Sequence, residues 1–169
     1  FRGQTLGFVF QFHHLLPAFT ALENVMEAPI HVDRLPRSEA HALAMGLLSK
    51  VGLADRAHHL PAQLSGGQLQ RVMTAMALCP KPDLVIFDEP TTALDVTTQI
   101  DVLASIKRAI RETGVAALYI THDLAVVAQV ADHILVLRHG KMVEYGTTDQ
   151  IINAPREPYT QALVSVRSI

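Results

Sequence analysis

A short apolar run that ends in two carboxylates places the strongest constraint on this chain. Residues 84–87 contain no polar side chain, and Asp88, Glu89 and Pro90 follow them directly. An uninterrupted run of this length suits a strand that is buried on both faces of a parallel sheet. Binding sites in open α/β sheets lie beyond the carboxyl ends of such strands, so the sequence predicts a site at Asp88 and Glu89.

The region after residue 80 alternates between strand and helix patterns. Apolar periodicity predicts a helix over residues 96–113 and then a second buried strand over residues 116–120. The inward face of this helix is expected to carry Ile100, Leu103, Ile106 and Ile110. Strands joined by helices in this way predict an α/β fold with a mainly parallel sheet.

Residues 16–80 show helical patterns only, and a short strand over residues 6–10 precedes them. The sequence therefore predicts one domain with two parts. The α/β core is formed by residues 1–15 and 81–169, and a helical lobe formed by residues 16–80 is inserted into it.

Three helix starts are marked by a Ser or Thr that is followed three residues later by Glu or Gln, the spacing of a capping box. The pairs are Thr20 with Glu23, Ser65 with Gln68, and Thr147 with Gln150. The first helix is expected to stop before Pro29, because proline lacks the backbone N–H that a helix interior needs. A further helix is expected to open at Ser38.

The last part of the chain predicts a hairpin and a final helix. Two short strand patterns, residues 134–137 and 141–145, are joined through His139 and Gly140, a pair suited to a tight turn. A helix is then expected over residues 158–166.

Composition excludes several classes of protein. The 169 residues are 49% hydrophobic, too apolar for a disordered tail, and their net charge of −2 gives no basic surface for nucleic acid. Apolar runs fall short of the roughly 20 residues that cross a bilayer. The single cysteine, Cys79, cannot form an internal disulfide and suits a small core residue, so a cytoplasmic setting is expected.

Two glycines stand in the first turn of the helix that Ser65 caps. Gly66 and Gly67 each cost about 1 kcal/mol relative to Ala there, which indicates that the backbone must come close to another group. An anion at this helix start would meet unpaired N–H groups and the Ser65 hydroxyl. The helix dipole supplies only about 0.3–2 kcal/mol, so a nucleotide would need further phosphate ligands. A flexible loop that ends in a helix cap would use the same residue types.

The two carboxylates are expected to have different roles. Neighbouring side chains on a strand point to opposite sides, so one of Asp88 and Glu89 can hold Mg²⁺ while the other addresses a nucleophile. Pro90 is expected to hold Glu89 in an extended conformation. The alternative is that the two acidic residues only cap a loop.

Five motifs, taken in order, resemble the ATP-binding cassette (ABC) ATPases, a family of P-loop NTPases. Residues 64–68, Leu-Ser-Gly-Gly-Gln, resemble the family's signature motif, and Asp88 with Glu89 resemble its Walker B pair. Gln11 resembles the Q-loop glutamine, residues 93–95 the D-loop, and His122 the switch histidine. The resemblance covers most of the chain and implies a partial ABC ATPase core with an inserted helical subdomain.

The resemblance also implies a mechanism. Asp88 would anchor Mg²⁺ and Glu89 would orient or deprotonate the attacking water. Gln11 would contact the metal or the water, and His122 would hydrogen-bond the γ-phosphate. Ser65, Gly66, Gly67 and Gln68 would contact ATP held by the opposite subunit of a head-to-tail dimer, and Asp95 would couple the two sites.

One family motif is missing, because no Gly-x-x-x-x-Gly-Lys-[Ser/Thr] loop, the Walker A motif, occurs in the sequence. The chain is therefore expected to begin inside a longer protein, and by itself to bind ATP weakly and hydrolyse it poorly. If strands of the sheet are lacking, Val85 and Ile86 are expected to be left uncovered.

The two halves resemble different branches of the family. Residues 10–25 look like the ATPases of lipoprotein-release complexes, whereas the sequence from about residue 60 onward looks like oligopeptide and dipeptide importer ATPases. The longer match favours the ATP-binding subunit of a peptide importer. Its expected partners are transmembrane permease subunits and a second ABC ATPase, identical or different, and its expected place is the inner face of the cell membrane.

Two other functions stay open. The chain could belong to a soluble ABC protein of DNA repair or translation, although the net charge argues against it. It could also be a non-catalytic remnant that acts as a binding module. The histidine pairs 13–14 and 58–59 do not have metal-ligand spacing, and Arg71 is expected to be solvated or at an interface.

Overall fold

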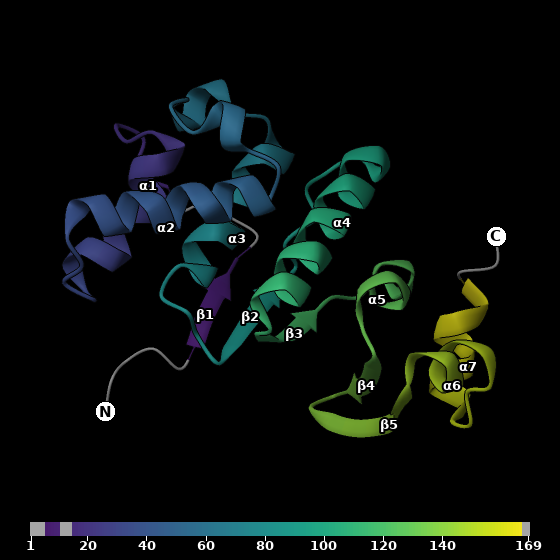
Figure 1. Cartoon of the computed structure of the whole chain (residues 1–169). Coiled ribbons are helices and arrows are strands. Elements are labelled where there is room, and N and C mark those ends of the chain that lie inside the picture. Colours follow the sequence, from purple (N-terminus) through teal and green to yellow (C-terminus); the bar gives the residue numbers. More distant parts are fainter. Residues whose placement is uncertain (1–5, 11–14, 167–169) are drawn as a thin grey trace. The chain divides into compact units, whose positions relative to one another are not determined.

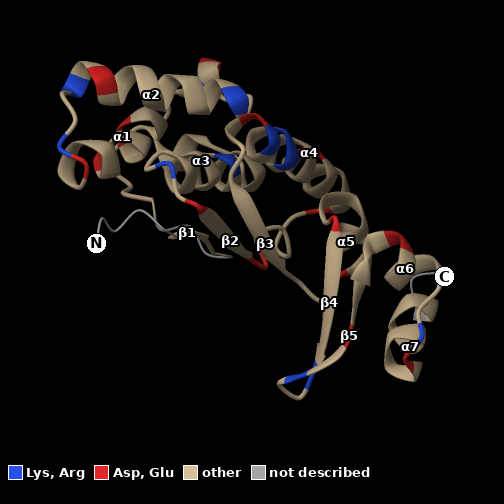
Figure 2. Cartoon of the chain, turned by 60° about the horizontal axis from the view of Figure 1, so that its bottom comes forward, with Lys and Arg blue, Asp and Glu red and all other residues tan. Residues whose placement is uncertain are grey.

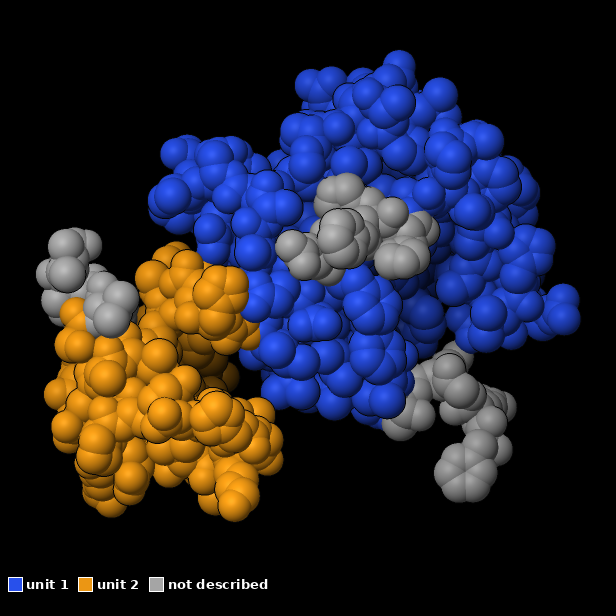
Figure 3. Space-filling model, turned by 180° about the vertical axis from the view of Figure 1, so that it is seen from behind, with its two compact units in different colours: residues 1–120 blue, residues 121–169 orange. Residues whose placement is uncertain are grey.

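The chain divides into two compact units, Phe1–Ile120 and Thr121–Ile169 (Figure 3). The structure is a computed structural model that describes residues 6–10 and 15–166 (Figure 1). Within the described residues, no helix has the length and apolar character that a membrane span requires.

The first unit is built on a parallel sheet of three strands. The strands β1 (Leu6–Val9), β2 (Leu84–Asp88) and β3 (Ala116–Ile120) lie in the order β1-β2-β3. Both outer strands run parallel to β2, so the three carboxyl ends meet at one edge, where Asp88 stands beside Ile120. The predicted α/β fold with a parallel sheet is confirmed.

In the described part of the segment between β1 and β2, the regular structure is helical. The helices are α1 (Ala21–His31), α2 (Arg37–Lys50) and α3 (Gly66–Leu78), with two short turns of 3-10 helix, η1 (Ala54–Arg56) and η2 (Pro61–Gln63). The helix α4 (Val96–Thr113) joins β2 to β3 and ends at Gly114, whose φ of +71° suits glycine.

All three predicted capping boxes are present, at Thr20, Ser65 and Thr147. Two helix ends differ from prediction. Pro29 lies inside α1, because the bond from Val32 N–H to the Ala28 carbonyl closes the last turn without needing a proline N–H. The helix α2 begins one residue before Ser38, with Pro36 at its N-cap and no side-chain cap.

Within the described residues of this unit, the helices cover one face of the sheet. Val9, Val85 and Phe87 are fully buried in a core that includes residues of all four helices of this unit. On the other face, apolar side chains that share the register of Asp88 are about half exposed: Leu6, Phe8, Leu118 and Ile120. The set of these four side chains is called the open sheet face below.

Three predictions about burial are wrong. Residues 116–120 form the expected strand, but only Tyr119 is even half-buried, because β3 is an outer strand with one open face. Val85 is fully buried, because the helices cover its face of the sheet, whereas Ile86 lies on the opposite face, which Asp88 shares, and is half-buried between the two outer strands. Ile100 is 49% exposed, whereas the other predicted residues of the α4 face point inward: Leu103 and Ile106 are buried with Val102, Ser105 and Ala109, and Ile110 packs against the core.

The second unit contains the predicted hairpin. The helix α5 (Leu124–Val130) precedes the strands β4 (His133–Arg138) and β5 (Lys141–Thr147), which pair antiparallel. His139 and Gly140 form the turn with φ values of +50° and +73°, as a tight hairpin turn requires. The helices α6 (Thr148–Asn153) and α7 (Pro158–Val166) follow, the latter with the bounds predicted.

A carboxylate on β5 ties down the segment that leads into α7. Glu144 accepts hydrogen bonds from Arg156 N–H at 2.9 Å and Glu157 N–H at 3.1 Å. The bond from the Arg156 backbone is the main cause that lowers the pKa of Glu144 below its ordinary value of 4.5. The ionised form of Glu144 therefore stabilises this unit.

We expect Glu144→Gln to destabilise the second unit at neutral pH and to weaken its sensitivity to acid. A carboxylate with a lowered pKa contributes stability above pH 4.5, and this contribution is lost as the pH falls through the lower pKa of the folded state. The measurement is urea unfolding at pH 7 and in acid, followed by the NMR signals of Gly140 and Gly146. Glu39→Gln, on the exposed first turn of α2, is the control. Equal acid sensitivity in the wild type and Glu144→Gln would contradict the assignment.

Candidate functional site

The edge of the sheet at the end of β2 carries the two predicted carboxylates. Asp88 is the last residue of β2, and its side chain is exposed. Glu89 lies outside the strand with a φ of +49°, and its N–H donates to the Ile120 carbonyl at 3.0 Å. A non-glycine residue in this region costs about 1–3 kcal/mol, and such strain gathers at functional sites.

The predicted extended conformation of Glu89 is wrong. The bond to Ile120 and a turn closed by Thr92 N–H on the Glu89 carbonyl hold the backbone in the left-handed region, which Pro90 does not forbid. Strand alternation therefore does not set the direction of the Glu89 side chain. Instead, the Thr92 hydroxyl donates to the Glu89 carboxylate and turns it toward the segment that leads to α4.

The start of α3 presents backbone N–H groups next to an exposed serine. Ser65 caps the helix, its hydroxyl accepting from Gln68 N–H at 3.3 Å while its own N–H donates to the Gln68 side chain at 2.9 Å. The amides of Gly66 and Gly67 lie in the first turn, where an α-helix offers no carbonyl partner. This arrangement of a cap, free amides and a helix dipole suits an anion.

Contacts within the chain explain why positions 66 and 67 are glycine. A Cβ atom on Gly67 would lie 2.5 Å from the Thr98 methyl and 3.1 Å from Val102, and one on Gly66 would lie 3.1 Å from Leu94. The predicted need for close approach is thus met by the start of α4 and the residue before its cap. A requirement for phosphate is not needed to explain Gly67.

Asp95 is the cap of α4. Its carboxylate accepts from Thr98 N–H at 3.0 Å and from the Thr98 hydroxyl at 2.6 Å. These bonds, the hydroxyl first, lower the pKa of Asp95 below its ordinary value. Sequence reasoning missed this role, although an Asp followed three residues later by Thr at a helix start was a usable signal.

The remaining predicted residues are placed as follows. Gln11, His13 and His14 lie outside the described residues. Phe10, the residue before Gln11, is described, and its carbonyl accepts a hydrogen bond from the Gln70 side chain of α3 at 3.5 Å. His122 is exposed in the second unit, directly before Asp123, which caps α5. Within the described ranges no three His, Cys, Asp or Glu side chains gather as metal ligands.

Two residues have structural roles. Arg71, predicted to be solvated or at an interface, is half-buried and donates to the carbonyls of Gly67 and Val51, so that it ties α3 to the end of α2. Cys79 is a core residue, as predicted, and burial raises the pKa of its thiol to about 12.

Comparison with known proteins agrees with these features. The family described as ABC transporter matches residues 1–92, more than half of the chain. This match shows that the chain belongs to the ABC transporter family, and the parallel sheet whose central strand ends at Asp88 and the serine-capped diglycine helix agree with it.

Several curated relatives match nearly the whole chain. The arginine transport ATP-binding protein ArgV of Corynebacterium glutamicum is 44% identical over 95% of this chain, and the L-cystine import ATP-binding protein TcyC of Bacillus subtilis is 45% identical over 94%. The glutathione import ATP-binding protein GsiA of Escherichia coli is 43% identical over 97%. The chain spans 63%, 64% and 27% of these relatives, respectively.

We expect Gly67→Ala to lower the free energy of unfolding by about 1–3 kcal/mol, because two β-branched side chains of α4 must move away from the added methyl group. Gly46→Ala is the matched control. It also lies in a helix, nothing stands within 4 Å of its added Cβ, and it should stabilise the chain by about 1 kcal/mol. Urea unfolding measures both. An unchanged midpoint for Gly67→Ala would show that α3 and α4 are not held this closely.

Proposed function

We propose that this chain is part of the ATP-binding subunit of an ABC importer that couples ATP hydrolysis to the uptake of amino acids or short peptides. One observation carries the proposal: a single compact unit holds both the Asp88–Glu89 edge and the Ser65-capped start of α3. The relatives named for arginine, L-cystine and glutathione transport support the substrate class.

The start of α3 is proposed to bind the terminal phosphate of ATP held by a second ABC ATPase, identical or different. The exposed Ser65 hydroxyl, the amides of Gly66 and Gly67 and the Gln68 side chain supply donors. One helix start supplies too little energy to hold a triphosphate alone, which favours a site shared between two subunits. Asp95 would couple the two shared sites, since its cap fixes the segment that lies against Gly66 and Gly67.

The sheet edge is proposed to hold Mg²⁺ and the attacking water. Asp88 fits the metal, because an exposed carboxylate at a strand end is a hard oxygen ligand and Mg²⁺ in such sites uses one or two carboxylates beside the phosphates. When bound, Mg²⁺ neutralises charge on the phosphate oxygens. Glu89 would orient the water and accept its proton, with its carboxylate turned by the Thr92 hydroxyl.

Two further residues complete the proposed site. Gln11 would contact the metal or the water and report on the membrane partner, and its neighbour Phe10 is tied to α3 through Gln70. His122 would hydrogen-bond the γ-phosphate from the segment that follows β3. The proposed partners are transmembrane permease subunits at the inner face of the cell membrane.

Lipoprotein release, a nucleic-acid machine and a non-catalytic remnant are the alternatives. The import and transport names of the relatives favour uptake over lipoprotein release. Lys and Arg residues are spread over both ends of α2, over α4 and over the β4–β5 turn, and not in one stripe as a nucleic-acid surface needs (Figure 2). Copurification with membrane subunits, and not with DNA or ribosomes, would support the proposal.

The decisive test uses the chain together with its upstream coding sequence. An intact Gly-rich phosphate loop in frame before Phe1 would favour the enzyme over the remnant. In that protein, Glu89→Gln should lower ATP turnover by about 10²–10⁴-fold and leave nucleotide binding intact, because only the general base is lost. Glu39→Gln is the control.

The 169-residue chain alone is expected to hydrolyse ATP poorly. Glu89-dependent turnover by the chain alone would contradict the need for an upstream loop. Full turnover of Glu89→Gln in the longer protein would contradict the catalytic role itself.

A further inference from the structure

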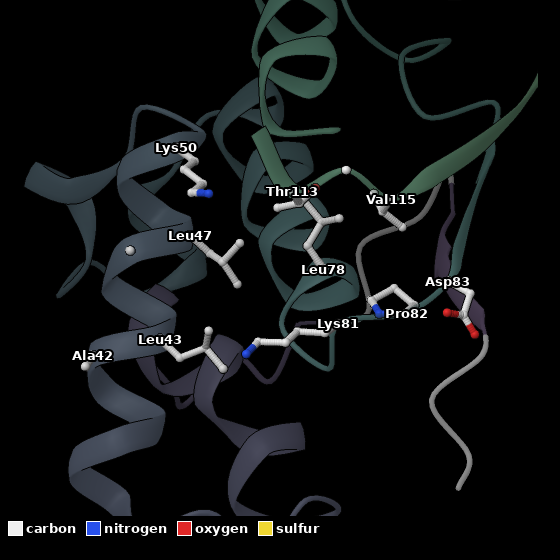
Figure 4. Close-up of a pocket in the computed structure, with 12 residues that line it drawn as sticks. Ala42, Leu43, Leu47, Lys50, Leu78, Lys81, Pro82, Asp83, Thr113 and Val115 are labelled. Carbon is white, nitrogen blue, oxygen red and sulfur yellow. The ribbon is translucent and has the colours of Figure 1, made fainter. Parts of the chain in front are cut away.

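A recess in the first unit is lined by residues that take no part in the proposed ATP site. It has a volume of about 540 Å³ and is formed by the second half of α2, the α3–β2 connection and the α4–β3 connection (Figure 4). Asp83 on its wall stands just before β2, whereas Asp88 ends that strand. Five strand residues at about 3.3 Å each separate the recess from the carboxylate edge by about 16 Å.

The recess combines an apolar lining with positive charge. Leu43 and Leu47 from α2 face Leu78 from α3 and Val115 across it (Figure 4). Pockets for small ligands have this character, with mostly apolar walls and a few polar groups that fix orientation, and volumes of about 300–1,000 Å³.

Two lysines and one carboxylate supply the charge. Lys50 lies 3.9 Å from Glu112, at the limit of an ion pair, and within the described residues the Lys81 ammonium group forms none. Figure 4 shows the Lys81 side chain extending toward Leu43, over the apolar wall. Asp83 is the carboxylate of the lining, and because Glu112 pairs with Lys50, Lys81 is the lining cation that remains to meet an anion.

Two residues of the lining are locally unfavourable where they stand. Gly46 occupies the interior of α2, where glycine weakens a helix, and no atom lies within 4 Å of the Cβ it lacks. Lys81 has a φ of +55°, a backbone conformation that suits glycine or asparagine. Both residues shape the recess, because Gly46 has no side chain to fill it and Lys81 places a positive charge in it.

We propose that this recess binds a small molecule with an apolar body and one carboxylate group. The carboxylate would pair with the Lys81 ammonium group, and the apolar body would cover the leucine-lined wall. This site is independent of the proposed ATP hydrolysis, so that either proposal can fail without the other.

The test titrates the ¹⁵N-labelled chain with octanoate and follows the amide signals of Gly46, Gly114 and Val115. Octanol and octylamine have the same hydrocarbon chain as octanoate but lack its negative charge, and they are titrated in parallel. We expect saturable shifts at these amides, with octanoate bound more tightly than octanol and octylamine bound least. Octylamine binding as tightly as octanoate, shifts confined to the open sheet face, or no saturable shift at all would overturn the proposal.

Three variants sharpen this test. Lys81→Gln should weaken the binding of octanoate by about two- to fivefold, because an exposed charge pair is lost, and it should leave the binding of octanol unchanged. Lys141, on β5, is also exposed, and Lys141→Gln should change the affinity for neither octanoate nor octanol. Gly46→Leu should fill the recess and abolish binding while it raises the melting temperature, because leucine favours the helix. Retained binding in Gly46→Leu, or equal effects of the two lysine variants, would refute the site.

Discussion

The close approach of α3 to α4 is the contact on which the arrangement of the first unit depends. Gly67 brings the backbone of α3 against Thr98 and Val102, and Leu94 lies over Gly66. Because Leu94 belongs to the segment that connects β2 to α4, the same contact sets the start of α3 beside the turn that follows the catalytic candidates Asp88 and Glu89. A bulkier residue at Gly67 would separate two elements whose proximity the proposed function requires.

Arginine side chains secure the other end of this helical layer. Arg71 from α3 donates to Val51, and Arg108 from α4 donates twice to the Lys50 carbonyl, at 3.1 Å and 2.9 Å. Both guanidinium groups thus meet the carbonyls at the end of α2, where the helix dipole favours positive charge. Three helices are held together there by polar contacts, while their apolar faces pack on the sheet.

Local signals in the sequence were sufficient for much of the fold. The capping boxes were predicted correctly at Thr20, Ser65 and Thr147, because a capping box depends on only four neighbouring residues. The hairpin turn at His139 and Gly140 was predicted correctly for the same reason. The exposure of Ile100 and of the strand β3 could not be read in this way, since it depends on which faces other elements cover.

The candidate site also combines features that local sequence predicts with features that long-range contacts determine. Motif order located Asp88, Glu89 and Ser65, but the left-handed backbone of Glu89 arises from bonds to Ile120 and Thr92, of which the first is distant in sequence. The neighbour that requires Gly67 to lack a side chain is likewise 31 positions away, at Thr98. Residue types therefore indicate a chemistry that stays a prediction, whereas long-range contacts decide the conformation.

The open sheet face has a consequence for how the chain behaves in water. Leu6, Phe8, Leu118 and Ile120 are each about half exposed on one side of a parallel sheet, and such sheets are normally covered on both sides. Exposed apolar side chains attract other apolar surfaces, and this attraction strengthens on warming from low temperature. At high concentration, we therefore expect copies of the isolated polypeptide to associate through these four side chains.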